Sequence, residues 1–280
     1  MDPTQRAARI FGEFAEAYAL KYGDVGRYGP SLDRFLALIP DGGHVLELAC
    51  GPGNVTRGLA DRRPDVRILS TDLAQEMLML ARRAVPEAEH LLLDMRAVGT
   101  LGQQFHGVVC AFGLTYLDQQ AAAKFIRDVA GCLLPGGALY LSTMEDDPAK
   151  SGWEGPSEDR LILMNYHLAK DLGAVLRTAG LASVLEDRVS YVAPNGNAVT
   201  DLLIVARTYL NHGRTTDTAA CLGASRGLGT RPLRQTSVQR KEEDLLHVVG
   251  ARGTRSDQVD TRAASGMVRR TAGCLRSLAQ

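Results

Sequence analysis

The sequence lacks several features that would place it in a specialised class of protein. None of its five cysteines stands in a Cys-x-x-Cys pair, so neither a zinc site nor a disulfide framework is indicated. No apolar run reaches the ~20 residues that a membrane span needs, and the first residues have no basic and apolar segments of a signal peptide. We therefore expect a cytoplasmic protein without membrane association.

Aromatic residues are absent from positions 211–280, where Leu, Ile, Val and Phe together number 12. This segment holds 12 Lys and Arg against 6 Asp and Glu, which leaves 20 basic and 26 acidic residues in positions 1–210. A charged segment with so little apolar surface does not form a core of its own. We predict a folded domain over 1–210, whose acidic balance disfavours a nucleic-acid partner, and a basic disordered tail over 211–280.

Short apolar runs alternate with helical patterns in the first part of the chain, and this alternation predicts a parallel sheet with right-handed crossovers. Two later strands flank the turn Pro194-Asn195-Gly196-Asn197, which indicates an antiparallel hairpin. The fold class is therefore α/β. Strands are expected at 45–50, 67–71, 89–93, 106–112, 138–143, 182–192 and 199–208, and helices at 4–22, from Ser31, at 55–62, 75–84, 119–133 and 168–179.

The first strand leads into a glycine turn, Gly51-Pro52-Gly53, which a helical pattern follows. Glycine has no Cβ, so a ligand can come close to the backbone and to the N-terminus of the helix. Glu47 is an acid within the apolar strand, where a carboxyl group needs a partner. Asp72 ends the second strand about twenty residues later, a position from which an acid accepts hydrogen bonds from ribose hydroxyls. Asp94 follows the third strand.

These features together resemble the class I S-adenosylmethionine (SAM) dependent methyltransferases. The stretch Glu47-Leu48-Ala49-Cys50-Gly51-Pro52-Gly53 is similar to the first motif of that family, and the resemblance continues through Leu133-Leu134-Pro135-Gly136-Gly137. It covers roughly residues 10 to 209. The resemblance implies a mostly parallel Rossmann-like sheet with a C-terminal antiparallel hairpin, helices on both faces, and SAM as the cofactor. The expected reaction is an in-line displacement that moves the methyl group to an acceptor.

By this resemblance the backbone around the glycine turn faces the methionine part of SAM, and Glu47 either organises the loop or meets the amino group of the cofactor. Leu73 packs on the adenine, and Asp94 accepts from the adenine amino group. The simpler interpretations are a tight turn at the glycines and a helix cap at Asp72. The full predicted cofactor set is Glu47, Ala49, Gly51, Gly53, Asn54, Asp72, Leu73, Asp94, Met95 and Phe112.

The residues after the fourth strand bear on the acceptor. DNA adenine methyltransferases carry an Asn/Asp-Pro-Pro-Tyr turn there, whereas this chain has Phe112-Gly113-Leu114-Thr115-Tyr116, and Cys110 lacks the following proline of the DNA cytosine enzymes. A small-molecule acceptor is therefore expected. Its predicted pocket uses Tyr18, Tyr22, Tyr28, Tyr116 and Trp153, the last from a long loop at 145–165.

His167, beside Tyr166, is the titratable group best placed to act as a general base, and the competing interpretation is a surface or helix-capping histidine. Glu145-Asp146-Asp147 supplies three acids, but a charged loop is ordinarily just solvated, so we expect no metal.

Two other functional classes stay open: a nicotinamide-dependent oxidoreductase, which Thr56 and Glu47 disfavour, and a binding module that holds SAM without catalysis. Gly223-Ala224-Ser225-Arg226-Gly227-Leu228-Gly229 resembles a dehydrogenase turn but follows no convincing strand. The acceptor, the methylated atom and the oligomeric state are left undetermined.

Overall fold

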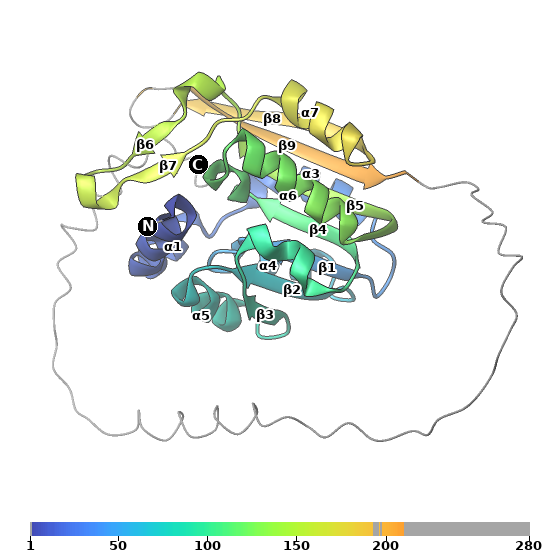
Figure 1. Cartoon of the computed structure of the whole chain (residues 1–280). Helices are drawn as coiled ribbons and strands as arrows, with labels where there is room; N and C mark the ends of the chain where they lie inside the picture. The colour runs from blue at the N-terminus through green and yellow to red at the C-terminus, as the bar shows by residue number, and fades with distance from the viewer. Residues whose placement is uncertain (1, 193–195, 197, 210–280) are drawn as a thin grey trace, which may run out of the picture. The chain divides into compact units, whose positions relative to one another are not determined.

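The computed structural model describes residues 2–192, 196 and 198–209. These residues form a seven-stranded sheet in the order β3-β2-β1-β4-β5-β9-β8 (Figure 1). Strands β1 to β5 are parallel, and β9 lies antiparallel between β5 and β8, which confirms the predicted fold class. The strands are β1 (His44–Leu48), β2 (Arg67–Asp72), β3 (Glu89–Leu92), β4 (Phe105–Ala111), β5 (Leu133–Met144), β8 (Leu181–Val192) and β9 (Ala198–Thr208).

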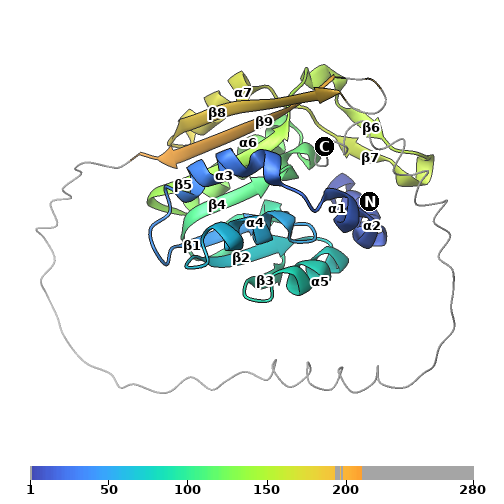
Figure 2. The same cartoon turned by 180° about the vertical axis from the view of Figure 1, so that it is seen from behind.

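Helices cover both faces of the sheet. Alternate side chains of a strand point to opposite faces. Val45 therefore lies in the core that includes α3 (Gly29–Leu36) and α4 (Asn54–Arg62), whereas Leu46 lies in the core that includes α6 (Gln119–Gly131) and α7 (Ala169–Thr178). Helices α3 and α4 lie on the face of the sheet that is toward the viewer in Figure 2, and this is the far face in Figure 1. Both faces of the central strands are buried, which explains why their sequences read as continuous apolar runs.

The N-terminal segment forms two helices, α1 (Pro3–Glu13) and α2 (Ala15–Tyr22), where the sequence predicts a single helix at 4–22. The break falls at Phe14, whose backbone angles of φ −118° and ψ 21° are not helical. Asp2 caps α1 by accepting from the backbone N–H groups of Thr4 and Gln5. The two short helices lie at the carboxyl ends of the parallel strands, and α1 contacts α5 (Gln75–Ala84) (Figures 1 and 2).

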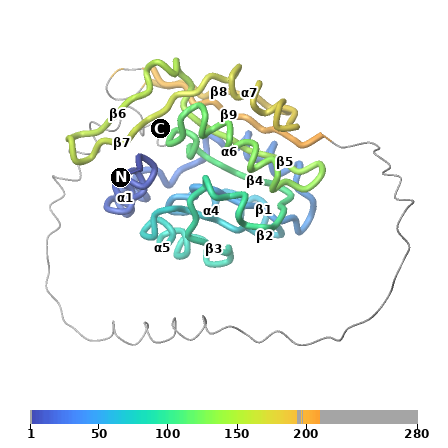
Figure 3. The backbone as a smooth tube through the Cα atoms, in the orientation of Figure 1, coloured from blue at the N-terminus to red at the C-terminus, as the bar shows by residue number. Residues whose placement is uncertain are grey.

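The segment 145–165 is not the structureless loop that the sequence predicts. It contains an antiparallel pair, β6 (Gly152–Glu154) and β7 (Ile162–Met164), which lies beside α1 (Figure 3). Ile162 and Met164 are buried against Ala7 and Ile10 of α1. Strands of three residues carry too little pattern to be read from sequence, and the packing on α1 stabilises this hairpin.

Other predicted boundaries move by a few residues. Strand β5 begins at Leu133, five positions before the expected start, because Leu133 pairs with Phe105 ahead of an irregularity in β4. The predicted tail 211–280, the glycine stretch at 223–229 and most of the turn at 194–197 lie outside the described residues. Among the helices of the described part, none has the length and apolar content to cross a membrane.

Candidate functional site

The turn after β1 has an unusual backbone. Ala49, Gly51 and Gly53 all have positive φ, at 56°, 57° and 87°. A Cβ on Gly53 would lie 2.9 Å from the Cα of Ala81 in α5, so only glycine fits at this close approach between helix α4 and helix α5. A Cβ on Gly51 would meet nothing within 4 Å, so the backbone there faces open space. One glycine therefore serves packing, and the other leaves room for a ligand.

Asp72, at the end of β2, is held by the backbone on both sides. Its Oδ2 accepts from the N–H of Gly51 at 2.8 Å, and its Oδ1 accepts from the N–H of Ala74 at 2.8 Å. Burial raises the pKa of this carboxyl group, although the backbone donors at Ala74 and Gly51 oppose the shift. Each oxygen retains a lone pair, so a fixed acceptor is available beside the glycine turn.

Asp94 follows β3 and forms a bidentate ion pair with Arg96, whose Nε lies 3.0 Å from Oδ1 and whose Nη2 lies 2.6 Å from Oδ2. The Nη1 of Arg96 also donates to Oδ2 of Asp2, the residue that caps α1, at 2.8 Å. Hydrogen bonds and ion pairs to both carboxylates raise the pKa of Arg96. A connected chain of charges thus ties α1 to the end of β3.

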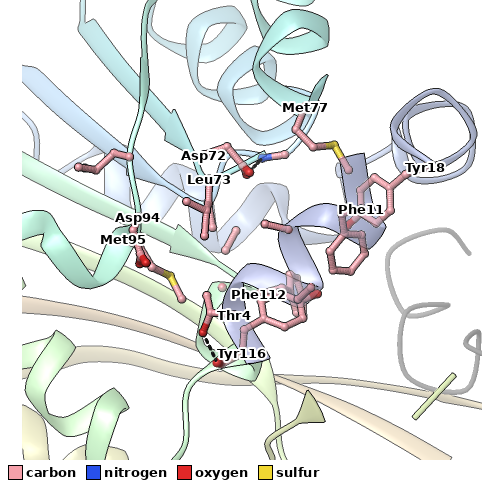
Figure 4. Close-up of a pocket in the computed structure, with 17 residues that line it drawn as sticks. Thr4, Phe11, Tyr18, Asp72, Leu73, Met77, Asp94, Met95, Phe112 and Tyr116 are labelled. Carbon is pink, nitrogen blue, oxygen red and sulfur yellow. Dashed lines mark hydrogen bonds between the residues drawn. The ribbon is translucent and has the colours of Figure 1, made fainter. Parts of the chain in front are cut away.

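A pocket opens where these groups meet, at the carboxyl ends of the parallel strands (Figure 4). Helix α1 forms its outer wall, and the turn at Gly51 with the ends of β2 and β4 forms its inner wall. Its lining comprises Thr4, Ala7, Ala8, Phe11, Tyr18, Ala49, Gly51, Asp72, Leu73, Met77, Leu93, Asp94, Met95, Ala111, Phe112, Gly113 and Tyr116.

Two non-glycine residues of the described part have positive φ, Ala49 and Phe112, and both line this pocket. Such backbone conformations cost free energy and concentrate at functional sites. Phe112 begins the 3-10 helix η3 (Gly113–Tyr116), in which a Cβ on Gly113 would collide with Sγ of Cys110 at 2.7 Å. The turn after β4 is therefore tightly constrained next to the turn after β1.

Seven of the ten predicted cofactor residues line the pocket, namely Ala49, Gly51, Asp72, Leu73, Asp94, Met95 and Phe112. The other three do not. Gly53 lies under α5, as described above. Asn54 donates from Nδ2 to the carbonyl of Tyr22 at 2.7 Å and so joins α4 to α2.

Glu47 lies behind the pocket wall and is almost fully buried. Its Oε2 lies 2.6 Å from Oγ1 of Thr56, in the first turns of α4. Burial raises the pKa of Glu47 to about 8, the hydrogen bond to Thr56 lowers it in part, and the charge of Asp72 adds to the increase. Glu47 thus fastens the start of α4 to β1, which favours the loop-organising role over direct contact with the cofactor.

Of the residues predicted to form the pocket for the methyl acceptor, some line the observed pocket and others do not. Tyr18 and Tyr116 line the pocket, whereas Tyr22, Tyr28 and Trp153 are absent from its lining. Tyr28 is buried behind Phe112 and donates to Oδ2 of Asp201 at 2.8 Å. Trp153 lies on β6 with 49% of its surface exposed, under the guanidinium of Arg6.

His167 is neither a surface histidine nor a pocket group. Its side chain is fully buried, and its Nε2 lies 3.1 Å from the carbonyl oxygens of both Leu114 and Leu117. Burial lowers its pKa. Tyr166 points elsewhere and donates to Oε1 of Glu154 at 3.0 Å. Both residues are predicted catalytic groups, and the structure places neither in the pocket lining.

His167 instead takes part in a set of contacts around η3. Asn165 donates to the carbonyl of Thr115 from its backbone N at 2.8 Å and from Nδ2 at 3.1 Å. Thr4 of α1 donates from Oγ1 to the carbonyl of Tyr116 at 3.4 Å. The four consecutive carbonyls 114–117 therefore all have partners from distant segments, and together these contacts hold the backbone that carries Tyr116.

The acids at 145–147 do not converge on a site. Glu145 pairs with Arg188 and caps α7 by accepting from the N–H of Ala169, and Asp146 pairs with Lys150. In the part of the chain that the structure describes, no three His, Cys, Asp or Glu residues form a group able to hold a metal.

The sequence points to the N-terminal segment as a pocket wall through its tyrosines, but it does not single out Thr4, Ala7, Ala8 and Phe11 of α1 or Met77 of α5. The available signal is the apolar face of α1, which in sequence has the pattern of an ordinary packing face. Phe11 lies edge-on to Tyr18 and to Tyr116, with ring centroids 5.7 and 5.5 Å apart (Figure 4). An aromatic surface therefore faces the glycine turn across the pocket.

The fold and the site together define a class of protein. A parallel sheet with an antiparallel β9, a glycine turn after β1 and an acid at the end of β2 characterise Rossmann-like proteins that bind a nucleoside cofactor at the strand ends. The residues fit such a group, because Asp72 presents a fixed acceptor and Gly51 leaves open space beside it.

Comparison with known proteins narrows this class. The family model described as "Methyltransferase domain" matches residues 45–137. Trans-aconitate 2-methyltransferase of Variovorax paradoxus is 28% identical over 196 residues, which cover 69% of this chain and 71% of that protein. Ubiquinone biosynthesis O-methyltransferase of Xanthomonas axonopodis pv. citri is 31% identical over 164 residues, 54% of this chain and 66% of that protein. The matches thus span about two thirds of the length of both relatives.

Among solved structures, the complex of DhpI with S-adenosylhomocysteine (SAH) is similar in fold. Its TM-score is 0.58 at 21% identity, and the match covers 74% of this chain and 98% of that one. Residues 45–137 thus match a methyltransferase domain, and the enzyme is a SAM-dependent methyltransferase with SAM as its cofactor. This result sets aside the nicotinamide-dependent alternative.

Proposed function

We propose that this enzyme transfers the methyl group of SAM to a small-molecule acceptor bound in the pocket beneath α1. One observation carries the proposal: the carboxylate of Asp72, fixed by the N–H groups of Gly51 and Ala74, borders a pocket that an aromatic surface closes on the opposite side. A site for the nucleoside of SAM and an apolar site for the methyl acceptor then lie within one cavity. Methyl transfer requires this, because both substrates must be bound side by side.

The proposed cofactor contacts follow from the lining. Asp72 accepts from the ribose hydroxyls, Leu73 and Met95 lie along the adenine, and Asp94 faces its amino group. The open backbone of Gly51 and Ala49 accommodates the methionine part. Glu47, Gly53 and Asn54 act indirectly, by fixing the turn and the start of α4.

When bound, SAM supplies a methyl group on a sulfonium sulfur, which is already activated toward a nucleophile in line with the sulfur–carbon bond. The chain's own contribution is to align the acceptor and to exclude water, and alignment alone can lower a barrier by ~7–11 kcal/mol. Phe11, Tyr18 and Tyr116 hold the acceptor against the glycine turn. His167 is not proposed as a base, because its ring is buried and engaged with backbone carbonyls.

The relatives named above act on trans-aconitate and in ubiquinone biosynthesis, and both names support a small-molecule acceptor here. We propose a cytoplasmic enzyme without a nucleic-acid partner, whose catalytic domain comprises residues 1–210. The boundary is supported by the composition of 211–280, which lacks aromatic residues.

The test combines binding with turnover. Calorimetry should detect SAM and SAH binding to the purified protein in the presence of a chelator, and no binding of NADH. A screen of small molecules with methyl-labelled SAM should then give labelled, low-molecular-weight products. Binding of SAM with no product from any small molecule, or with label in nucleic acid alone, would contradict the proposed acceptor class.

A further inference from the structure

The charges of the pocket lining are of one sign. Its two charged residues are the carboxylates Asp72 and Asp94, and none of its seventeen described residues is Lys, Arg or His. Asp94 is already paired with Arg96, whose guanidinium is shared with Asp2. A second anion entering the pocket would therefore find no cationic side chain in the lining.

The two arginines of α1 are engaged elsewhere. Arg6 of α1 donates to the carbonyls of Leu161 and Glu158 and stacks on Trp153. Arg9 pairs with Glu13, one turn along the same helix. These partners keep both guanidinium groups of α1 directed away from the pocket lining, in which neither residue appears.

The surface opposite the glycine turn is aromatic and largely apolar. Phe11 stands between Tyr18 and Tyr116, in edge-on contact with both rings, and Phe112 closes the floor next to the turn (Figure 4). Ala7 and Ala8 of α1 add small apolar groups. Aromatic rings offset or edge-on to one another provide favourable contact for a further planar ring.

We propose that the acceptor is an uncharged, planar and largely apolar molecule, such as a phenol or hydroquinone, in preference to a carboxylic acid. The proposal rests on the function given above. A single reacting oxygen can carry negative charge, because it faces the sulfonium of bound SAM. Any further carboxylate would lose its hydration without gaining a cationic partner, and an unpaired charge is strongly disfavoured in a partly buried site.

Matched acceptor pairs test this proposal. Para-propylphenol and para-hydroxyphenylpropionate share a ring and a chain length and differ in one carboxylate. Binding of each to the protein saturated with SAH is measured by calorimetry at pH 7, and trans-aconitate serves as a polycarboxylate probe. The neutral phenol should bind at least tenfold more tightly than its carboxylate counterpart, and trans-aconitate should show no binding at the same concentrations.

A variant makes the electrostatic cause explicit. Phe11→Arg places a cation in the aromatic surface and should reduce the preference for the neutral phenol at least threefold, whereas Phe11→Leu should weaken both ligands and keep their ratio. Methyl transfer to each ligand is measured in parallel. Equal or tighter binding of the carboxylate by the wild-type protein, or binding of neither phenol, would overturn the proposal.

The outcomes separate this inference from the proposed function. If the protein prefers trans-aconitate and methylates it, the proposed function stands, because trans-aconitate is a small molecule. The inference that the acceptor is uncharged would then be wrong. Failure of the protein to bind SAH would instead refute the cofactor site and the proposed function with it.

Discussion

The Nε2 atom of His167 lies 3.1 Å from the carbonyl oxygen of Leu114, although 53 positions separate the two residues in sequence. A carbonyl oxygen can only accept, so Nε2 carries the hydrogen and donates it, and the same atom reaches the carbonyl of Leu117. Because these carbonyls belong to the turn that carries Tyr116, the histidine holds in place a ring that lines the pocket, although His167 itself is not part of the lining.

His167→Phe should therefore impair the acceptor step and spare the cofactor. Leaving two carbonyls without their donor costs about 1–3 kcal/mol, so the melting temperature should fall and kcat/KM for the acceptor should drop at least tenfold. SAM affinity by calorimetry should change less than threefold. His167→Gln, which retains a side-chain donor, should recover much of the loss. If the rate of the wild-type enzyme falls at low pH and the rate of the glutamine variant does not, His167 would instead be identified as a proton-transfer group.

The two glycines of the first turn should respond differently to alanine. Gly53→Ala brings a Cβ to 2.9 Å from the Cα of Ala81, so urea unfolding should show a loss of ~2 kcal/mol or more. Gly51→Ala adds only backbone strain of about 1–2 kcal/mol, since its Cβ meets open space. That Cβ enters the pocket, however, and SAM affinity should fall at least tenfold. Equal effects of the two variants on SAM affinity would contradict this division of roles.

Glu47 should make the protein less stable as the pH rises. Its folded pKa of about 8 exceeds the unfolded value of ~4.3, so the folded state binds more protons between these values. The stabilising contribution is complete below pH ~4.3 and is lost as the pH approaches 8. Glu47→Gln, which stays neutral, should therefore gain stability relative to wild type between pH 5 and pH 8, by on the order of a few kcal/mol.

Urea unfolding at pH 5 and at pH 8 provides the measurement. The matched control is Glu13→Gln, which makes the same substitution at an exposed carboxyl on α1. Parallel stability curves for wild type and Glu47→Gln would show that Glu47 ionises normally in the folded protein.

Asp72→Asn should weaken SAM binding. In the proposed complex the ionised carboxylate accepts from the ribose hydroxyls. Hydrogen bonds to a charged group contribute about 1.5–3 kcal/mol, so calorimetry should show at least a tenfold loss of SAM affinity. The raised pKa of Asp72 implies that wild-type affinity declines as the pH falls through that pKa, because only the ionised form is a full acceptor. Asp61→Asn, in an exposed pair with Arg57, is the control. Unchanged affinity in Asp72→Asn would exclude the ribose contact.

The parts of the site that sequence predicts are those encoded locally. A strand, a glycine turn and an acid one strand later occupy fixed places on a parallel sheet, so the spacing of these residues suffices to place Gly51 beside Asp72. The acids after β2 and β3 likewise belong to one edge by topology alone.

What sequence missed depends on contacts between distant segments. Thr4 reaches Tyr116, and Asn165 reaches Thr115, through hydrogen bonds that no spacing rule anticipates. His167 has the chemistry of a base, but its hydrogen bonds to carbonyls some 50 positions away hold it outside the pocket lining. Trp153 is predicted to line the pocket because it is a large side chain in a long loop. In the structure it lies on the short hairpin β6–β7, outside the pocket lining.

The ion pairs that Arg96 makes with Asp2 and Asp94 also have a kinetic consequence. Helix α1 forms the outer wall of the cavity, so an outward movement of this helix would widen the path by which SAH leaves. Asp2 and Arg96 are partly accessible to solvent, and dissolved ions weaken such contacts. Ionic strength should therefore act on the rate of cofactor exchange, and raising the salt concentration should speed SAH release, which can be measured by stopped flow.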